Sequence, residues 1–450
     1  MTSGQRRRCF GLLCSAGDVW ACVLEVNAWR RRRQDTPLVG YQELCRELAV
    51  SGPGTFGGLD STGARSVLRR FSDAWFAAAK RRKAGDAAVR FPRRRRALMP
   101  VRWYHGTFSI TDRRVRIPCA KGSPGLEVRL ARDLPYPVEQ VRSITLLCEG
   151  GRLFLDVTAE IPVTVYPPGE EPVPGRVAGV DLGIIHPYAV AGSDGQGLLV
   201  SGRAIRAEHR MHLADTKARR RAVARRAPKP GQKGSRRWRR YRRRARQIEG
   251  RHRRRVRQAY HEAAKTVIGW AVQQRIGVLH VGDPRGVLDL PAGRRHNLRL
   301  RQWQIGRAIQ ILTDKATLAG VTVHLVDERG TSSTCPTCHR RVPKPRGRVF
   351  TCPHCGYTGH RDLTAAATIA TRAPGGGPTT TTAPVVLPQV VTHRRAGRHL
   401  PGAGQSRRDP RRPPRRRDGS VGQRWPAPPP DGGESLAHHS EDPQHPPETR

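Results

Sequence analysis

Four cysteines have the spacing of a zinc site. Cys335 and Cys338 form one CxxC pair, and Cys352 and Cys355 form a second pair after thirteen intervening residues. Each pair places two thiolates on one tight turn, so two pairs joined by a short hairpin supply the four sulfur ligands of tetrahedral Zn²⁺. Four unrelated core cysteines would not be expected to fall into two such pairs. We therefore predict a structural zinc ribbon at 334–356, because four thiolates leave no coordination position open.

Two carboxylates stand where a catalytic metal would be bound. Asp181 ends the apolar run VAGVD, and Asp362 follows the second cysteine pair by seven residues, at the start of an alanine-rich segment. Carboxylate oxygens suit Mg²⁺, and two such ions can activate water and stabilise the leaving oxygen of a phosphodiester. Each residue alone is equally compatible with a turn or a helix cap. Their combination with the zinc ribbon and a basic segment favours metal binding.

Predicted strands and helices alternate in the half of the chain that holds these residues. The strands are expected at 177–181, 188–191, 276–282 and 321–327. The helices are expected at 259–274, at 302–319 and from residue 363 to about residue 371. This order predicts an α/β fold with parallel strands, whose functional groups gather at the carboxyl ends of the strands. Asp181 and Asp362 would then meet at one edge of the sheet.

The first 172 residues indicate a separate domain. Residues 9–26 alternate apolar and small side chains and are interpreted as strand, whereas 64–82 have apolar residues at helical spacing. Residues 106–162 are interpreted as strands, with a hairpin turn at Glu149-Gly150-Gly151. We predict a β-domain over 1–172 with a helical insertion at about 30–100.

The chain is strongly basic, with 83 Lys and Arg against 36 Asp and Glu and a net charge of +47. The excess is concentrated in 203–257, which holds 24 basic and three acidic residues and is divided by Pro228 and Pro230 into two predicted helices of a hairpin. Such a density of one charge would repel itself without phosphates nearby, so we predict nucleic-acid contacts here. The expected contact residues are Arg236, Arg237, Trp238, Arg239, Arg240, Arg242 and Arg243.

Composition also bears on location and on the C-terminal segment. The other six cysteines lack the spacing of a disulfide framework, which favours the reducing cytoplasm, with association to the nucleoid. No apolar run is judged long enough to span a membrane. Residues 373–450 are rich in Pro, Thr and Arg and are predicted to be a disordered tail. The sequence makes no prediction of the oligomeric state.

The whole pattern resembles the TnpB family, the transposon-encoded RNA-guided nucleases of OrfB type that are related to type V CRISPR effectors. The resemblance covers about residues 9–372 and rests on the motifs VAGVDLG (177–183), VDERGTSSTCPTC (326–338), CPHCG (352–356) and HRDLTAA (360–366). It implies a RuvC-like, RNase H-type nuclease domain over 173–333 and 357–372, interrupted by the zinc ribbon. It also implies an N-terminal β-barrel wedge domain with a helical recognition insertion, and Mg²⁺-dependent cleavage of double-stranded DNA chosen by a guide RNA that the element encodes.

One position departs from the family pattern in a way that affects catalysis. The family usually has a catalytic Glu at the end of the strand that here ends in Gly282. Asp283 is adjacent, but successive side chains of a strand point to opposite faces. Glu328 ends the next predicted strand, roughly 10 Å from the strand of Asp181 at the usual strand spacing. We therefore predict that Asp181, Glu328 and Asp362 are the catalytic Mg²⁺ ligands.

Two further departures flank Asp362. His360 stands where the family often has an acidic residue, and Thr364 stands where it often has Asn. We interpret His360 as a polar residue at a helix start rather than as a metal ligand.

Two other functions stay open at this point. Because the usual Glu is absent, the protein could be an RNA-guided DNA binder that represses without cutting. It could also be a zinc-ribbon accessory protein of transposition that binds DNA without a guide. Copurification of a defined RNA separates the guided functions from the unguided one.

Overall fold

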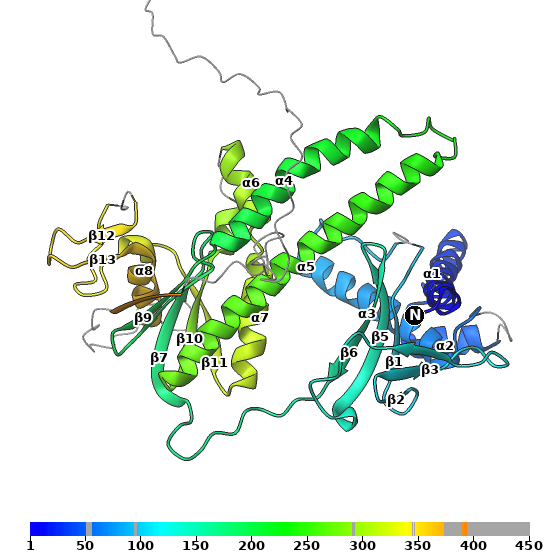
Figure 1. Cartoon of the computed structure of the whole chain (residues 1–450), viewed down its shortest axis with the longest axis horizontal. Coiled ribbons are helices and arrows are strands. Elements are labelled where there is room, and N and C mark those ends of the chain that lie inside the picture. The colour runs from blue at the N-terminus through cyan, green and yellow to red at the C-terminus, as the bar shows by residue number, and fades with distance from the viewer. Residues whose placement is uncertain are drawn as a thin grey trace, which may run out of the picture. The chain divides into compact units, whose positions relative to one another are not determined.

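The structure is a computed structural model that describes residues 1–50, 56–93, 97–289, 293–343, 345, 347–372 and 389–393 (Figure 1). The N-terminal part begins with three helices, α1 (Ser3–Arg32), α2 (Tyr41–Val50) and α3 (Ser61–Lys83). Thr2 and Gln5 form a capping box at the start of α1, and the Asp60 carboxylate accepts two backbone N–H groups at the start of α3.

Helix α1 corrects two expectations. Residues 9–26 were expected to be strand, but they lie inside this helix, and the helical segment begins at residue 3 rather than at about 30. Its buried residues recur every three or four positions, as Cys9, Leu13, Ala16 and Val23 illustrate, so the helical period is the one that fits the core. By length and composition α1 could also cross a membrane, contrary to the expectation that no apolar run is long enough. Nine of its residues are buried, and its apolar ones belong to the N-terminal core.

Two small antiparallel sheets complete the N-terminal part. One has the order β1-β5-β6 (Val101–Tyr104, Val141–Glu149 and Arg152–Ala159), with the predicted hairpin between β5 and β6. The other has the order β2-β3-β4 (Ser109–Thr111, Arg114–Ile117 and Leu126–Arg129), and a short 3₁₀ helix, η1, spans Val138–Gln140. The indole N–H of Trp103 donates to the Asp60 carboxylate over 2.8 Å, which ties β1 to the start of α3.

The second part is built on a six-stranded sheet with the order β11-β10-β7-β8-β9-β14. Its strands are β7 (Val173–Asp181), β8 (Tyr188–Gly192), β9 (Gln196–Val200), β10 (Ile276–Asp283), β11 (Thr322–Asp327) and β14 (Gln389–His393). Strands β7, β10 and β11 are parallel, but β8 is antiparallel to both β7 and β9. The expectation of parallel strands is therefore confirmed for β7, β10 and β11 but is wrong for β8, because the short links on either side of β8 permit only antiparallel neighbours.

Helices cover both faces of this sheet (Figure 1). The long helix α5 (Arg236–Gln273) and α7 (Ile305–Leu318) pack on one face, where Val267 and Leu312 share a core with Val180 and Leu279. Helix α8 (Arg361–Ala370) packs on the other face. A Cβ at Gly179 would lie 1.9 Å from the carbonyl oxygen of Ala366, so only glycine in β7 permits this approach of α8.

The remaining elements surround the sheet. Helix α4 (Arg203–Ala224) forms the predicted hairpin with α5, and α6 spans Arg294–Gln302. The 3₁₀ helices η2 (Pro284–Asp289) and η3 (Thr331–Ser333) follow β10 and β11, and the cysteine pairs flank the hairpin of β12 (Val349–Thr351) and β13 (Thr358–His360).

The prediction that residues 373–450 are disordered is wrong for one segment. Gln389–His393 form β14, which pairs in parallel with β9 at the edge of the sheet. Within the predicted tail, residues 373–388 and 394–450 lie outside the described residues.

Candidate metal centres

The four predicted zinc ligands converge. The Sγ atoms of Cys335 and Cys355 lie 3.6 Å apart, as do those of Cys338 and Cys352, and all four sulfurs are within 4.8 Å of one another. A tetrahedral Zn²⁺ with Zn–S bonds of about 2.3 Å requires sulfurs at about this spacing. The buried side chains of Val342, Phe350 and Tyr357 pack around them. The cluster thus has the composition and geometry of a zinc-ribbon site.

Asp181, Glu328 and Asp362 lie at the carboxyl edge of the sheet, near enough for Glu328 and Asp362 to act electrostatically on Asp181. Among the described residues, their oxygens do not form a group of ligand atoms that all lie within 4.8 Å of one another. Asp181 ends β7, Glu328 directly follows β11, and Asp362 lies in the first turn of α8. The pKa of Asp181 is well above its ordinary value, first because of burial and then because of the negative charges of Glu328 and Asp362. A divalent cation near Asp181 would offset this repulsion.

Glu328 occupies the space above Gly282. A Cβ built at Gly282 would lie 3.1 Å from both Cβ and Oε2 of Glu328, and 2.8 Å from Cδ1 of Ile369. The Glu328 side chain therefore lies where the side chain of the usual Glu would begin. Oε2 is buried and has no hydrogen-bond partner among the residues that the structure describes. Burial, followed by the charges of Asp283 and Asp327, raises the pKa of Glu328 to about 7. A buried, unpartnered carboxylate oxygen fits a cation ligand.

Asp283, the other residue near Gly282, is engaged elsewhere. Both of its carboxylate oxygens accept hydrogen bonds from Arg285, and these bonds hold the Asp283 pKa below its ordinary value. Its negative charge raises the pKa of Glu328. The geometry therefore favours Glu328 over Asp283 as the third carboxylate.

Two residues that the sequence analysis did not select hold Asp362. Nδ1 of His186 lies 2.8 Å from Oδ2 of Asp362, and the Arg348 guanidinium donates to both carboxylate oxygens at 3.0 and 2.8 Å. Burial alone would raise the pKa of Asp362, but these two partners lower it below its ordinary value. His186 lies five residues after the end of β7, and its position near a predicted strand end could have marked it as a candidate in the sequence. No sequence feature marks Arg348 as a candidate.

The two departures beside Asp362 have structural partners. His360 caps α8, where its Nδ1 accepts the backbone N–H of Asp362 over 3.3 Å, as expected of a polar residue at a helix start. The buried hydroxyl of Thr364 lies 3.2 Å from the Tyr357 hydroxyl and links α8 to the cysteine ribbon.

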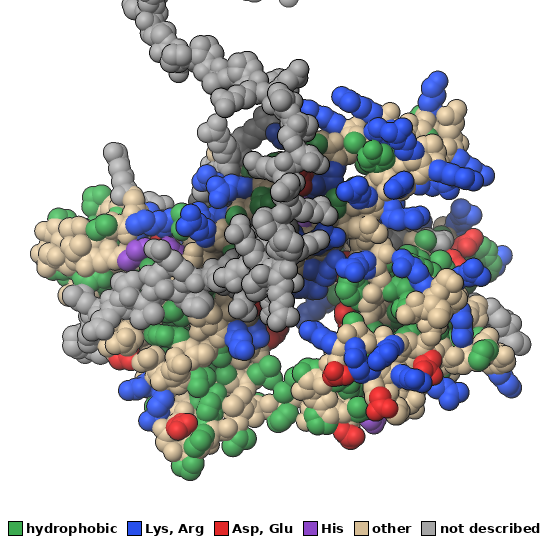
Figure 2. Space-filling view, in the orientation of Figure 1, with side chains coloured by type: hydrophobic (Ala, Val, Ile, Leu, Met, Phe, Trp, Pro, Cys, Tyr) green, Lys and Arg blue, Asp and Glu red, His purple; other side chains and the backbone are tan. Residues whose placement is uncertain are grey.

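The basic hairpin exposes the arginines among its predicted contact residues, whereas Trp238 is half-buried. Lys and Arg side chains gather over this hairpin (Figure 2). The guanidinium of Arg242 lies 4.5 Å from the Trp238 ring centre, and that of Arg226 lies 4.5 Å from the ring centre of Tyr241. A groove of about 1470 Å³ is lined in part by Trp238, Arg239, Arg242 and Arg243, whereas Arg236, Arg237 and Arg240 lie outside its lining. Cationic side chains interleaved with aromatic rings can bind both the phosphates and the bases of a nucleic acid.

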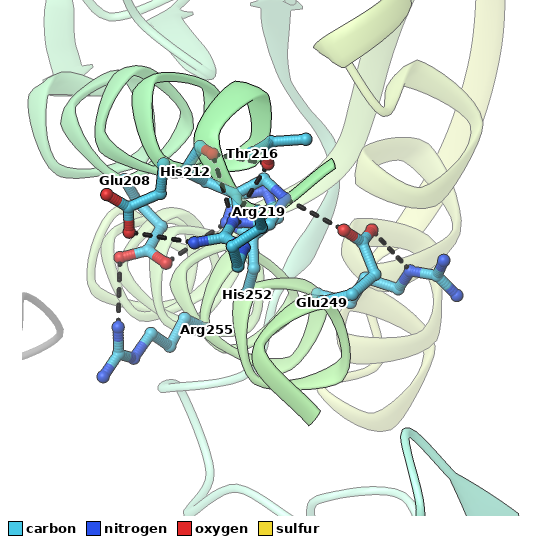
Figure 3. Close-up of polar contacts among 9 residues, drawn as sticks. Glu208, His212, Thr216, Arg219, Glu249, His252 and Arg255 are labelled. Carbon is cyan, nitrogen blue, oxygen red and sulfur yellow. Dashed lines mark hydrogen bonds and ion pairs between the residues drawn. The ribbon is translucent and has the colours of Figure 1, made fainter. Parts of the chain in front are cut away.

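A buried polar cluster joins α4 to α5 (Figure 3). The imidazoles of His212 and His252 stack with ring centres 3.8 Å apart, and each ring also contacts a carboxylate, Glu249 at 2.9 Å and Glu208 at 3.2 Å. Arg255 lies 3.5 Å from Glu208. The cluster fixes the two helices of the basic hairpin to each other.

This cluster predicts a pH-dependent stability. Burial and then the neighbouring His252 lower the pKa of His209 to about 4, and burial also lowers the pKa of His212. Unfolded histidines titrate near about 6.5, so between about pH 6.5 and about pH 4 the unfolded chain binds more protons and stability falls as the pH falls. We expect the melting temperature to decrease by several degrees from about pH 7.5 to about pH 5.

Comparison of melting curves for His209→Gln and for His105→Gln, which lies outside the cluster, isolates this contribution. The pH dependence should flatten in the first variant alone. An unchanged slope in His209→Gln would contradict the prediction.

Comparisons with known proteins find similarity to two family models and to solved structures. Residues 160–288 match the family model "OrfB_IS605: Probable transposase", and residues 306–369 match "Cas12f1-like, TNB domain". The solved structure "Cryo-EM structure of the Cas12f1-sgRNA-target DNA complex" is 12% identical, covers 81% of this chain and 82% of that chain, and superposes with a TM-score of 0.55. The structure "CasPhi-2 (Cas12j) bound to crRNA" is 11% identical and covers 80% and 95% with a TM-score of 0.41. No curated protein sequence matches the chain.

The mixed α/β fold resembles that of the protein in the Cas12f1 complex, and the cysteine ribbon lies within the region that matches the TNB domain. The two family matches are in line with the TnpB resemblance that the sequence motifs indicated.

Proposed function

We propose that this protein is an RNA-guided, Mg²⁺-dependent DNA endonuclease of a transposable element, acting in the cytoplasm at the nucleoid. The observation that carries the proposal is the Glu328 carboxylate, which lies over Gly282 with a buried, unpartnered oxygen and acts electrostatically on Asp181. The proposed partners are a guide RNA encoded by the element and target double-stranded DNA, in line with the sgRNA and target DNA of the similar Cas12f1 complex.

In this proposal the three carboxylates hold two Mg²⁺ ions. The ions would lower the pKa of the attacking water and stabilise the departing 3′ oxygen. Asp181, Glu328 and Asp362 orient the ions from three separate elements, and their mutual repulsion supplies the negative potential that attracts cations. A structural Zn²⁺ at the four cysteines would hold the ribbon against α8 through Tyr357 and Thr364.

The arginines of the basic hairpin are proposed to bind RNA and heteroduplex phosphates. Replacing Arg239, Arg242 and Arg243 by Gln should weaken nucleic-acid binding and lower the slope of log K against log salt by roughly 0.7–0.9 for each lost phosphate contact. Fluorescence anisotropy over a salt series measures this slope. The matched control replaces Arg114, Arg129 and Arg132, which are equally exposed outside the hairpin. Equal slopes in the two triple variants would remove the hairpin from the interface.

Gly282→Ala tests the packing of Glu328. The added Cβ must displace Ile369 or Glu328, so we expect about 1–3 kcal/mol of destabilisation, as for other overpacked sites, together with slower cleavage. Denaturant unfolding and a cleavage assay provide the two readouts. At Gly286 a Cβ would meet only Arg329, at 3.9 Å, so Gly286→Ala is the control. Unchanged stability and an unchanged cleavage rate in Gly282→Ala would contradict the prediction that the position of Glu328 depends on the absence of a side chain at residue 282.

An RNA-guided repressor that does not cut is the second candidate. It is favoured by the ion pair of Arg348 with both oxygens of Asp362, which neutralises one proposed ligand. The deciding experiment is plasmid cleavage with randomised flanking sequence, using protein purified with its bound RNA from its own flanking locus. Mg²⁺-dependent breaks support the nuclease, whereas guide-dependent binding without breaks supports the repressor.

A further inference from the structure

A second group of possible metal ligands adjoins the three carboxylates. His186, His360 and Asp362 each offer a ligand atom, and these atoms lie within 4.8 Å of one another. The two imidazole rings are 5.3 Å apart and meet edge to face at 71°. His186 comes from the segment between β7 and β8, whereas His360 and Asp362 come from the start of α8, so only the folded chain assembles the group.

Hydrolysis by Mg²⁺ does not account for these imidazoles. Mg²⁺ binds hard oxygen ligands, whereas imidazole nitrogens favour later first-row ions such as Fe²⁺, Co²⁺, Ni²⁺ and Zn²⁺. We propose that His186, His360 and Asp362 form a binding site for a divalent first-row transition metal ion. The inference rests on the proposed function only in that this ion would share Asp362 with the proposed Mg²⁺ site, and binding itself does not require cleavage.

The contacts of the two histidines are compatible with such a site. His186 Nδ1 and Asp362 Oδ2 are 2.8 Å apart, so a small rearrangement brings both to one ion. His360 Nδ1 accepts the backbone N–H of Asp362, and the 3.3 Å distance makes this a long hydrogen bond. Both rings are partly buried, which restricts their rotamers and lowers the entropy cost of binding.

Arg348 acts as the internal counter-ion of the site. Its guanidinium contacts both oxygens of Asp362, and 38% of its side chain is exposed, so it can swing into solvent when a metal ion supplies the positive charge. Metal ion and guanidinium therefore compete for Asp362. Removal of Arg348 should therefore increase the affinity for the metal ion. If the histidines had only a structural role, removing Arg348 would not have this effect.

The test is a Co²⁺ titration of the full chain with its cysteine ribbon preloaded with Zn²⁺, followed by visible d–d absorption. We expect one Co²⁺ ion outside the ribbon, without thiolate charge-transfer bands, displaced by Mn²⁺ more readily than by Mg²⁺. His186→Ala and His360→Ala should each weaken binding by at least about 10–100-fold. Arg348→Gln should strengthen binding. His261→Ala, which changes an exposed histidine of α5, should have no effect.

Two results would overturn the proposal. One is Co²⁺ that keeps the weak absorption of its hexahydrate, and the other is equal affinity in wild type, Arg348→Gln and both histidine variants. Arg348→Gln changes a partly exposed side chain, so the test holds even where a histidine variant does not fold. Co²⁺ binding without DNA cleavage would support the metal site and contradict the proposed nuclease function. Mg²⁺-dependent cleavage without Co²⁺ binding would support the nuclease function and contradict the metal site.

Discussion

Glu328→Gln is expected to reduce Mg²⁺-dependent DNA cleavage by more than about 100-fold, because a direct ligand should matter more than an outer-shell partner, whose loss costs about 10–100-fold. The amide keeps the size of the side chain and its place over Gly282, but it removes the negative charge that acts on Asp181. Binding of guide RNA and DNA should be unchanged, since the basic hairpin is untouched. Cleavage of a plasmid target and anisotropy binding, measured on the same preparation, separate the two effects.

The matched control for this variant is Asp283→Asn. Asp283 carries the same charge beside the same glycine, but it is paired with Arg285, so cleavage should fall little. A reversed order, with Asp283→Asn inactive and Glu328→Gln active, would refute the assignment of Glu328. In a double variant, Gly282→Glu with Glu328→Ala, we expect partial recovery relative to Glu328→Ala, because the carboxylate returns to the same space from β10.

Cys352→Ser is expected to abolish zinc binding and to unfold the ribbon. Structural zinc sites contribute apparent binding free energies of about 10–16 kcal/mol, which are folding free energies for the segment that they organise. Tyr357 and Thr364 connect the ribbon to α8, and α8 carries Asp362, so the variant should also lose cleavage activity. Elemental analysis and thermal melting measure the two losses.

Cys14→Ser is the control for the zinc prediction, since Cys14 is an exposed free cysteine of α1. It should keep both zinc content and melting temperature. Near-normal zinc in Cys352→Ser would mean that the four sulfurs do not form the site.

Much of the fold followed from local patterns. The basic hairpin was predictable because Pro228 and Pro230 interrupt two runs that otherwise favour helix, and α4 and α5 flank this break. The β5–β6 hairpin was predictable from its two glycines, Gly150 and Gly151, which both adopt positive φ. Helix α1 was missed because its small residues alternate with apolar ones over a short window, and only packing into the N-terminal core reveals the helical period.

The candidate site was predictable in part. Cysteine spacing and the motifs around Asp181 and Asp362 are local, so they could be read along the chain. The relation of Glu328 to Gly282 depends on two parallel strands whose registers align Gly282 with Val326. His186 and Arg348 reach Asp362 across 176 and 14 residues, and no sequence motif records either contact.

The sequence by itself determined the chemistry available to this protein: four paired thiolates, separated carboxylates and a dense basic segment, because residue type and short spacing fix donor atoms and charge. Only the tertiary structure shows which carboxylate lies over Gly282, the position of the absent Glu. Sheet order places β10 between β7 and β11, so residues 181, 282 and 328 become neighbours. It also decided which imidazoles surround Asp362. Such neighbours arise from strand register and from the packing of α8 on Gly179, which are properties of the assembled sheet rather than of any segment.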